Sequence, residues 1–167
     1  MILIPVARES LLDKLNRGIG DVAGANLTIT SARQQQVAFT DPVYPGVHEL
    51  LVTGPAAAAE IRSFDDLGRT LVHVRPSSSY YEHLERFNRA RRQAGKSQLR
   101  VRRADERLED DDLLDMVDKG AIPAVIVDSH WRRSGLRSSS TSVCMKTSPS
   151  IVVARSPGRC AGTIPNC

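Results

Sequence analysis

Residues 26–44 of this 167-residue chain read NLTITSARQQQVAFTDPVY, and this stretch decides the fold. Thr30 is a good N-cap for a helix that begins at the next residue, because its hydroxyl can accept a hydrogen bond from a free amide of the first turn. A side chain at Arg33, in that turn, is directed back toward the hydroxyl of Thr28 and the amide of Asn26. A guanidinium so placed can hold a carboxylate through two parallel hydrogen bonds. The stretch therefore predicts a place for an anionic ligand, with an arginine on a solvated helix face as the alternative.

Hydrophobic periodicity divides the chain into further strands and helices. Strands are expected at residues 2–6, 21–25, 47–53, 70–74, 99–103 and 122–127. Helices are expected at residues 9–17, 31–36, 78–94 and 111–119, with a short helical turn at 63–67. From residue 63 onward strands and helices alternate, which favours an α/β architecture with a largely parallel sheet.

Composition and charge argue against several classes of function. The formal net charge is +4, but residues 131–167 hold six of the 23 Lys and Arg and none of the 19 Asp and Glu, so the rest of the chain is slightly acidic. This distribution does not favour a nucleic-acid partner. No apolar run is long enough to be a transmembrane segment, and residues 1–6 lack the basic start and cleavage site of a signal peptide.

The strand and helix patterns of the preceding chain do not continue in residues 131–167. They are rich in serine, show no hydrophobic period and contain all three cysteines. An odd number of cysteines rules out complete internal pairing. Two interpretations stay open for this basic tail: a disordered segment, or the out-of-frame translation of a GC-rich gene.

Three blocks of sequence, in order along the chain, resemble the extracellular solute-binding proteins of family three, the amino-acid-binding type. The first is LTITSARQQQVAFTDPVY at residues 27–44; the second is LGRTLVHV at 67–74 followed by PSSSYY at 76–81; the third is GAIPAVIVD at 120–128. More narrowly, SSSYYEHL at 77–84 and LEDDDLLDMVDKGAIPAVIVDSH at 108–130 resemble the N-terminal solute-binding-like region of membrane-bound lytic transglycosylase F-like proteins.

The resemblance implies an α/β, periplasmic-binding-protein-like (type II) fold of two lobes that close on a small ligand. Residues 1–53 are expected to form a partial first lobe, residues 54–130 the second lobe, and residues 131–167 an irregular tail. The family's usual export signal and its opening strand and helix have no counterpart here, so we expect the fold to be incomplete. The resemblance also implies a periplasmic location.

The resemblance implies a ligand that is an amino acid or a similar small zwitterion. Carried onto this sequence, the resemblance implies that Arg33 takes the carboxylate and that Thr28 and Asn26 add hydrogen bonds. It also implies that Ser77 and Ser78 contribute hydroxyls and amides from the start of the second-lobe helix, and that Asp128 accepts from the ammonium. Ligands of open α/β sheets lie beyond the carboxyl ends of strands, which agrees with this place for Asp128. The alternative for Asp128 is a strand-end acid that caps a turn.

The sequence predicts neither a metal site nor a cofactor nor catalysis in this chain. The acidic run 109–112 lacks the alternation of a calcium loop and suits the solvated start of a helix, and the four histidines lack zinc-ligand spacing. The catalytic motif of lytic transglycosylases begins with Glu-Ser. The only such pair here, Glu9-Ser10, is followed by an ordinary amphipathic helix.

These observations predict a non-catalytic module of a lytic transglycosylase F-like protein that binds an amino acid or a muropeptide-like fragment of peptidoglycan. In a full-length relative, the partner of such a module is a murein-cleaving domain. One alternative is the substrate-binding receptor of an amino-acid ABC transporter, whose partner is a permease. A second alternative is a non-functional, truncated gene product.

Overall fold

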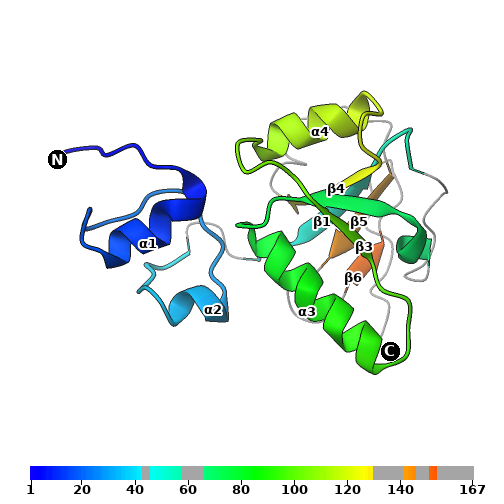
Figure 1. Ribbon diagram of the computed structural model, residues 1–167, viewed down its shortest axis with the longest axis horizontal. Coiled ribbons are helices and arrows are strands. Elements are labelled where there is room, and N and C mark those ends of the chain that lie inside the picture. The colour runs from blue at the N-terminus through cyan, green and yellow to red at the C-terminus, as the bar shows by residue number, and fades with distance from the viewer. Residues whose placement is uncertain (43–45, 58–65, 130–140, 146–150, 154–167) are drawn as a thin grey trace. The chain divides into compact units, whose positions relative to one another are not determined.

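The computed structural model describes residues 1–42, 46–57, 66–129, 141–145 and 151–153 (Figure 1). The chain divides into two compact units, Met1–Pro45 and Gly46–Cys167. This division falls earlier than the boundary that the sequence predicts at residue 53, because the strand ending there belongs to the sheet of the second unit. The assignment of 1–53 and 54–130 to two lobes stays a prediction.

The described part of the first unit is helical. It contains a 3-10 turn, η1 (Arg8–Ser10), and two short helices, α1 (Leu11–Asn16) and α2 (Ser31–Gln34). The strands predicted at 2–6 and 21–25 are wrong, since neither segment forms a strand. A strand needs a hydrogen-bonding partner and a covered face. No described segment of this unit pairs with either stretch, and Ile2 and Val22 are 88% and 86% exposed.

A six-stranded sheet forms the centre of the second unit, in the order β3-β2-β4-β1-β5-β6. Its strands are β1 (Glu49–Thr53), β2 (Leu71–Val74), β3 (Arg100–Arg103), β4 (Ala124–Asp128), β5 (Thr141–Met145) and β6 (Ile151–Val153). β2 is parallel to β3 and β4, whereas β1 is antiparallel to β4 and β5, and β5 to β6.

The sheet is therefore mixed, so the prediction of a largely parallel sheet is wrong. Helical crossovers keep β2, β3 and β4 parallel, but β5 and β6 are separated only by residues 146–150, a connection too short for a parallel pair. Both of these strands fall in the segment predicted to be an irregular tail. The described part of the chain leaves out residues 130–140, 146–150 and 154–167. It also leaves out most of the turn predicted at 63–67, whose last two residues belong to the 3-10 helix η2 (Asp66–Arg69).

Two helices cover opposite faces of this sheet (Figure 1). α3 (Ser79–Gln93) packs through Tyr80 and Leu84 on a cluster that includes Leu51, Val72, Val74 and Ile126. α4 (Asp110–Asp118) packs through Leu113 and Val117 on a second cluster that includes Leu50, Val52, Val125 and Val127. Successive residues of β1 and β4 thus point to opposite faces, as the pleat of a strand requires. The helices and strands predicted between residues 70 and 128 are confirmed, with ends shifted by one or two residues.

None of the helices in the described ranges is both long and apolar enough to cross a membrane.

Candidate functional site

In the first unit, Arg33 is held at the start of α2. Thr30 caps this helix as predicted, since its hydroxyl accepts a hydrogen bond from the Arg33 amide at 3.3 Å. Arg33 as a whole residue is 7% exposed. Its guanidinium points back along the chain, where Nη1 donates to the carbonyl oxygen of Thr28 at 3.1 Å. The predicted direction of the side chain is therefore correct. Its partner on Thr28 is the backbone carbonyl, whereas the sequence suggested the hydroxyl.

The loop that precedes α2 is also fixed at its other end. Arg8 Nη1 donates to the carbonyl oxygen of Ala25 at 3.4 Å. Asn26 has a φ of +48°, in the left-handed region that asparagine adopts more readily than most residues. Two arginines thus hold carbonyls of the loop 25–28, and the three residues predicted to bind a ligand in this unit, Asn26, Thr28 and Arg33, are neighbours in it.

In the second unit, the polar residues gather at the carboxyl edge of the sheet. β2 and β4 are parallel, so Arg75, which follows β2, and Asp128, which ends β4, lie at the same edge. Glu49 joins them because β1 is antiparallel to β4 and pairs Glu49 with Asp128. The loops that lead from β2 into α3 and from β3 into α4 begin at this edge as well. Such edges are where open α/β sheets bind ligands.

Both serines predicted to bind a ligand lie at the start of α3 and are engaged within the unit. Ser78 is the N-cap: its hydroxyl accepts from the Tyr81 amide at 3.2 Å and donates to the Arg75 carbonyl at 2.7 Å. The Ser77 amide and hydroxyl donate to the two carboxylate oxygens of Glu106, at 2.8 and 2.6 Å. Ser78 therefore has a structural role as a helix cap, and Ser77 holds an anion supplied by the chain itself.

A buried ion pair, absent from the sequence-based prediction, ties the two helix starts together. The guanidinium of Arg75 is 4% exposed and contacts Asp110 at 2.5 Å and Glu109 at 3.0 Å. Asp110 also accepts a hydrogen bond from the Tyr80 hydroxyl at 3.0 Å. The acidic run 109–112 was expected to be solvated; Asp111 and Asp112 are exposed, but Asp110 is buried because it is the counter-ion of Arg75.

A second buried pair lies nearby. His83 Nδ1 is 2.5 Å from Glu49 Oε1, and the Glu49 side chain is almost fully buried. Burial raises the pKa of Tyr80, and the carboxylates of Asp110, Asp128 and Glu49 raise it further. The tyrosine hydroxyl therefore stays protonated among three acids. Asp128, predicted as a ligand residue, belongs to the charge environment of this network.

The raised pKa of Tyr80 predicts a loss of stability at alkaline pH. Above about pH 10 an unfolded tyrosine releases its proton while the folded Tyr80 keeps it. The folded state then binds more protons, so the free energy of unfolding should fall by up to about 1.4 kcal/mol per pH unit. Urea titrations at pH 9 to 11 would measure this. The Tyr80→Phe variant, which has no proton to release there, should show a shallower fall, and identical slopes would contradict the assignment.

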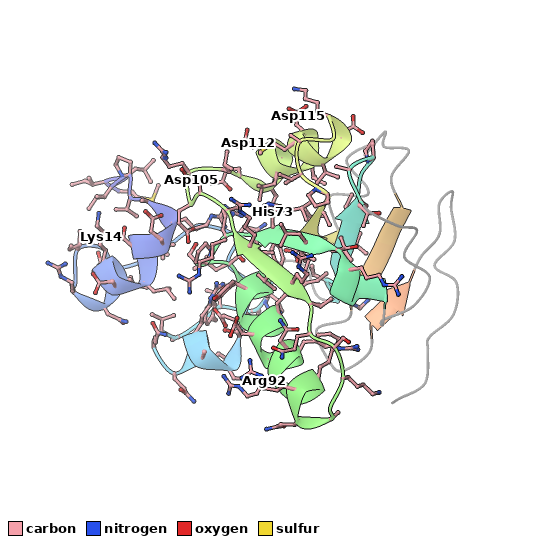
Figure 2. The ribbon with its side chains drawn as sticks, turned by 45° about the vertical axis from the view of Figure 1, so that its right-hand side comes forward. Lys14, His73, Arg92, Asp105, Asp112 and Asp115 are labelled. Atoms are coloured by element: carbon pink, nitrogen blue, oxygen red, sulfur yellow. The ribbon has the colours of Figure 1, made fainter. Side chains whose placement is uncertain are left out.

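Among the described residues, no group of three or more His, Cys, Asp or Glu is arranged to hold a metal ion. The carboxyl edge is instead organised by hydrogen bonds and ion pairs between its own residues. Figure 2 labels two residues of the segment that follows β3: Asp105 is on the loop between β3 and α4, and Asp112 is on α4. The arrangement offers polar recognition by fixed charges.

Comparison with known proteins connects these two sets of residues to a family. Residues 1–131 match the family described as bacterial extracellular solute-binding proteins, family 3. The chain belongs to this family. The match includes both Arg33 and the carboxyl edge of the second unit. The chain is also 31% identical, over 121 residues, to the membrane-bound lytic murein transglycosylase F of Saccharophagus degradans (strain 2-40 / ATCC 43961 / DSM 17024).

Solved structures of this fold are similar over most of the chain. An ancestral arginine-binding protein bound to arginine superposes with a TM-score of 0.63 at 22% identity, over 93% of this chain and 66% of that one. An ancestral amino acid-binding protein, a precursor of cyclohexadienyl dehydratase, gives a TM-score of 0.61 at 18% identity, over 87% and 63%. Holo ArgBP from T. maritima gives 0.54 at 19% identity, over 87% and 65%.

The family 3 chain therefore has the α/β fold of type II periplasmic amino-acid-binding proteins. It spans slightly less than two thirds of the length of these solved relatives. Its match to the transglycosylase covers 72% of this chain and 22% of that protein. The matched region is a solute-binding domain, and the family's members are extracellular proteins.

Proposed function

We propose that this family 3 chain binds an amino acid or a peptide fragment of peptidoglycan, as the non-catalytic solute-binding module of a lytic transglycosylase F-like protein in the periplasm. The observation that carries the proposal is the buried guanidinium of Arg33, directed along the loop of Thr28. The family match and the 31% identity to a lytic transglycosylase support the choice of module.

The site residues are assigned by the group of the solute that each can bind. Arg33 binds the carboxylate, with Asn26 and Thr28 beside it, because a guanidinium matches the fork of a carboxylate. Asp128 accepts from the ammonium at the carboxyl edge of the sheet, where it is one of three carboxylates around Tyr80. Ser77 and Ser78 contribute from the start of α3, with Ser77 first releasing its present partner.

The test is calorimetry of the full chain with a panel of amino acids and muropeptides, which includes the arginine and glutamine of the ancestral relatives. Arg33→Ala should weaken binding by about 100-fold, since charge-assisted hydrogen bonds contribute roughly 1.5–3 kcal/mol. Arg33→Lys keeps the charge but loses the fork, so we expect a smaller loss of about tenfold.

Arg17→Ala is the matched control, because it removes an exposed arginine of the same unit that pairs with Asp13, four residues before it. Circular dichroism of each variant separates a loss of binding from a loss of fold. Equal affinities of wild type and a folded Arg33→Ala variant would contradict the role of Arg33. A panel in which no solute binds the wild type would contradict the proposed function.

A further inference from the structure

Ser77 holds a carboxylate in the way that proteins hold an anionic ligand. It precedes the N-cap of α3, so its amide lies at the positive end of the helix. Its N–H donates to Glu106 Oε1 at 2.8 Å and its hydroxyl to Glu106 Oε2 at 2.6 Å. One residue thus engages both oxygens of a carboxylate that comes from 29 residues further along the chain. The structure therefore contains an anion at this position, and that anion is internal.

The loop that carries Glu106 is fixed on both sides. Before it, the Ala104 amide donates to the Val74 carbonyl at 2.8 Å and so extends the pairing of β3 with β2. Around it, Asp105 accepts from the Arg107 amide, Nε and Nη2 at 3.0, 3.1 and 2.7 Å. After it, Glu109 and Asp112 form a reciprocal capping box at the start of α4. The loop delivers Glu106 to Ser77 while the side chain of Glu106 itself stays partly exposed.

We infer that Glu106 is an internal competitor, which fills a carboxylate receptor at Ser77 and must leave before the carboxylate of a solute can bind there. This inference rests on the proposed function and adds a regulation to it. The apparent affinity of such a receptor is reduced by the fraction of time that it is open. An internal group acts at an effective concentration in the millimolar range or above, so a weak external carboxylate displaces it only partly. The exchange therefore favours solutes with additional contacts over simple anions.

The first test is chemical rescue of the full chain with acetate. Glu106→Ala should lower the melting temperature and move the Ser77 amide resonance, because its hydrogen-bond acceptor is gone. Sodium acetate, at concentrations up to about 100 mM, should restore both in this variant. Sodium chloride at the same ionic strength should restore neither, and acetate should leave the wild type unchanged. Failure of acetate to restore Glu106→Ala, or an equal response of the wild type, would overturn the inference.

Asp115→Ala provides the matched control. It removes one negative charge from the same unit, at an exposed carboxylate of α4 that pairs with Lys119 at 2.6 Å, and it changes neither Ser77 nor the loop of Glu106. Acetate should have no effect on this variant. A double variant, Glu106→Ala with Ser77→Ala, lacks the receptor hydroxyl and should require several-fold more acetate for the same recovery.

The second test separates this inference from the proposed function. For any amino acid or muropeptide that binds, Glu106→Ala should bind about tenfold more tightly than wild type, and Asp115→Ala should match the wild type. Equal affinities of wild type and Glu106→Ala would overturn the competition at Ser77 and leave the proposed function standing. Acetate rescue without binding of any solute, in any variant, would leave the exchange at Ser77 standing and overturn the proposed function.

Discussion

Replacing Arg75 with methionine should lower the free energy of unfolding of the second unit by about 3–5 kcal/mol, the usual cost of removing one partner of a buried ion pair. The loss arises because Asp110, whose side chain is only 12% exposed, loses the guanidinium at 2.5 Å. The Tyr80 hydroxyl is then its main partner, and a neutral donor compensates a buried carboxylate poorly. Urea unfolding followed by circular dichroism would measure the change.

Two further variants test whether loss of the Arg75–Asp110 ion pair causes the expected destabilisation. Arg107→Met removes an arginine whose ion pair with Asp105 is on the surface, and it should leave the unfolding midpoint unchanged. Adding Asp110→Asn to Arg75→Met removes the orphaned charge and should recover part of the stability. The explanation fails if Arg75→Met unfolds at the wild-type urea concentration, or if the double variant is less stable than the single one.

Gly54→Ala should be the second most damaging substitution, with a cost of about 3 kcal/mol. Gly54 follows β1 and passes so close to the end of α4 that an added Cβ would lie 2.1 Å from the carbonyl oxygen of Val117 and 2.8 Å from its Cγ1. The glycine cannot easily move away, since its amide donates to the Pro123 carbonyl at 3.0 Å. The obstacle is backbone, so α4 or β1 has to shift.

Gly68→Ala is the comparison for this variant. A Cβ at Gly68 would meet Ser97 Cβ and the Gln98 carbonyl at 3.4 and 3.5 Å, which are ordinary contacts. This substitution should therefore be neutral or stabilising by up to about 1 kcal/mol. Melting curves of both variants give the answer, and equal melting temperatures would show that the close approach of β1 to α4 relaxes at little cost.

The part of the fold that the sequence predicts correctly is the part with local signals. Thr30 caps α2, α3 and α4 form at the predicted helices 78–94 and 111–119, and the alternation of helices with β2, β3 and β4 sets the parallel part of the sheet. The segments 2–6 and 21–25 have the apolar residues of strands but no described partner strand in their unit. Hydrophobic periodicity reports the preference of a segment for a strand, but it contains no information on whether a partner strand lies beside that segment.

The candidate site shows the same distinction between contacts that local sequence patterns predict and contacts that depend on the overall fold. Thr30 and Arg33 are three residues apart within one helix turn, so helix geometry predicted their contact and the direction of the arginine. Arg75 and Asp110, Tyr80 and Asp110, and Ser77 and Glu106 are 29 to 35 residues apart and meet only through the register of the sheet. An arginine directly after a strand, followed by an acidic helix start, was the available signal. The two features lie too far apart in the chain for a local pattern to connect them.

The central place of β1 has a consequence for synthesis of the protein. β1 is the first strand of its unit to leave the ribosome, yet it is buried along its whole length between β4 and β5. These two strands are translated after β2 and β3, and only β6 follows them. At roughly 5–20 residues per second, several seconds separate β1 from Asp128. We expect a chaperone of nascent chains to bind at Glu49–Thr53 in that interval. Crosslinking of stalled nascent chains of increasing length should show this contact disappear once β4 has emerged.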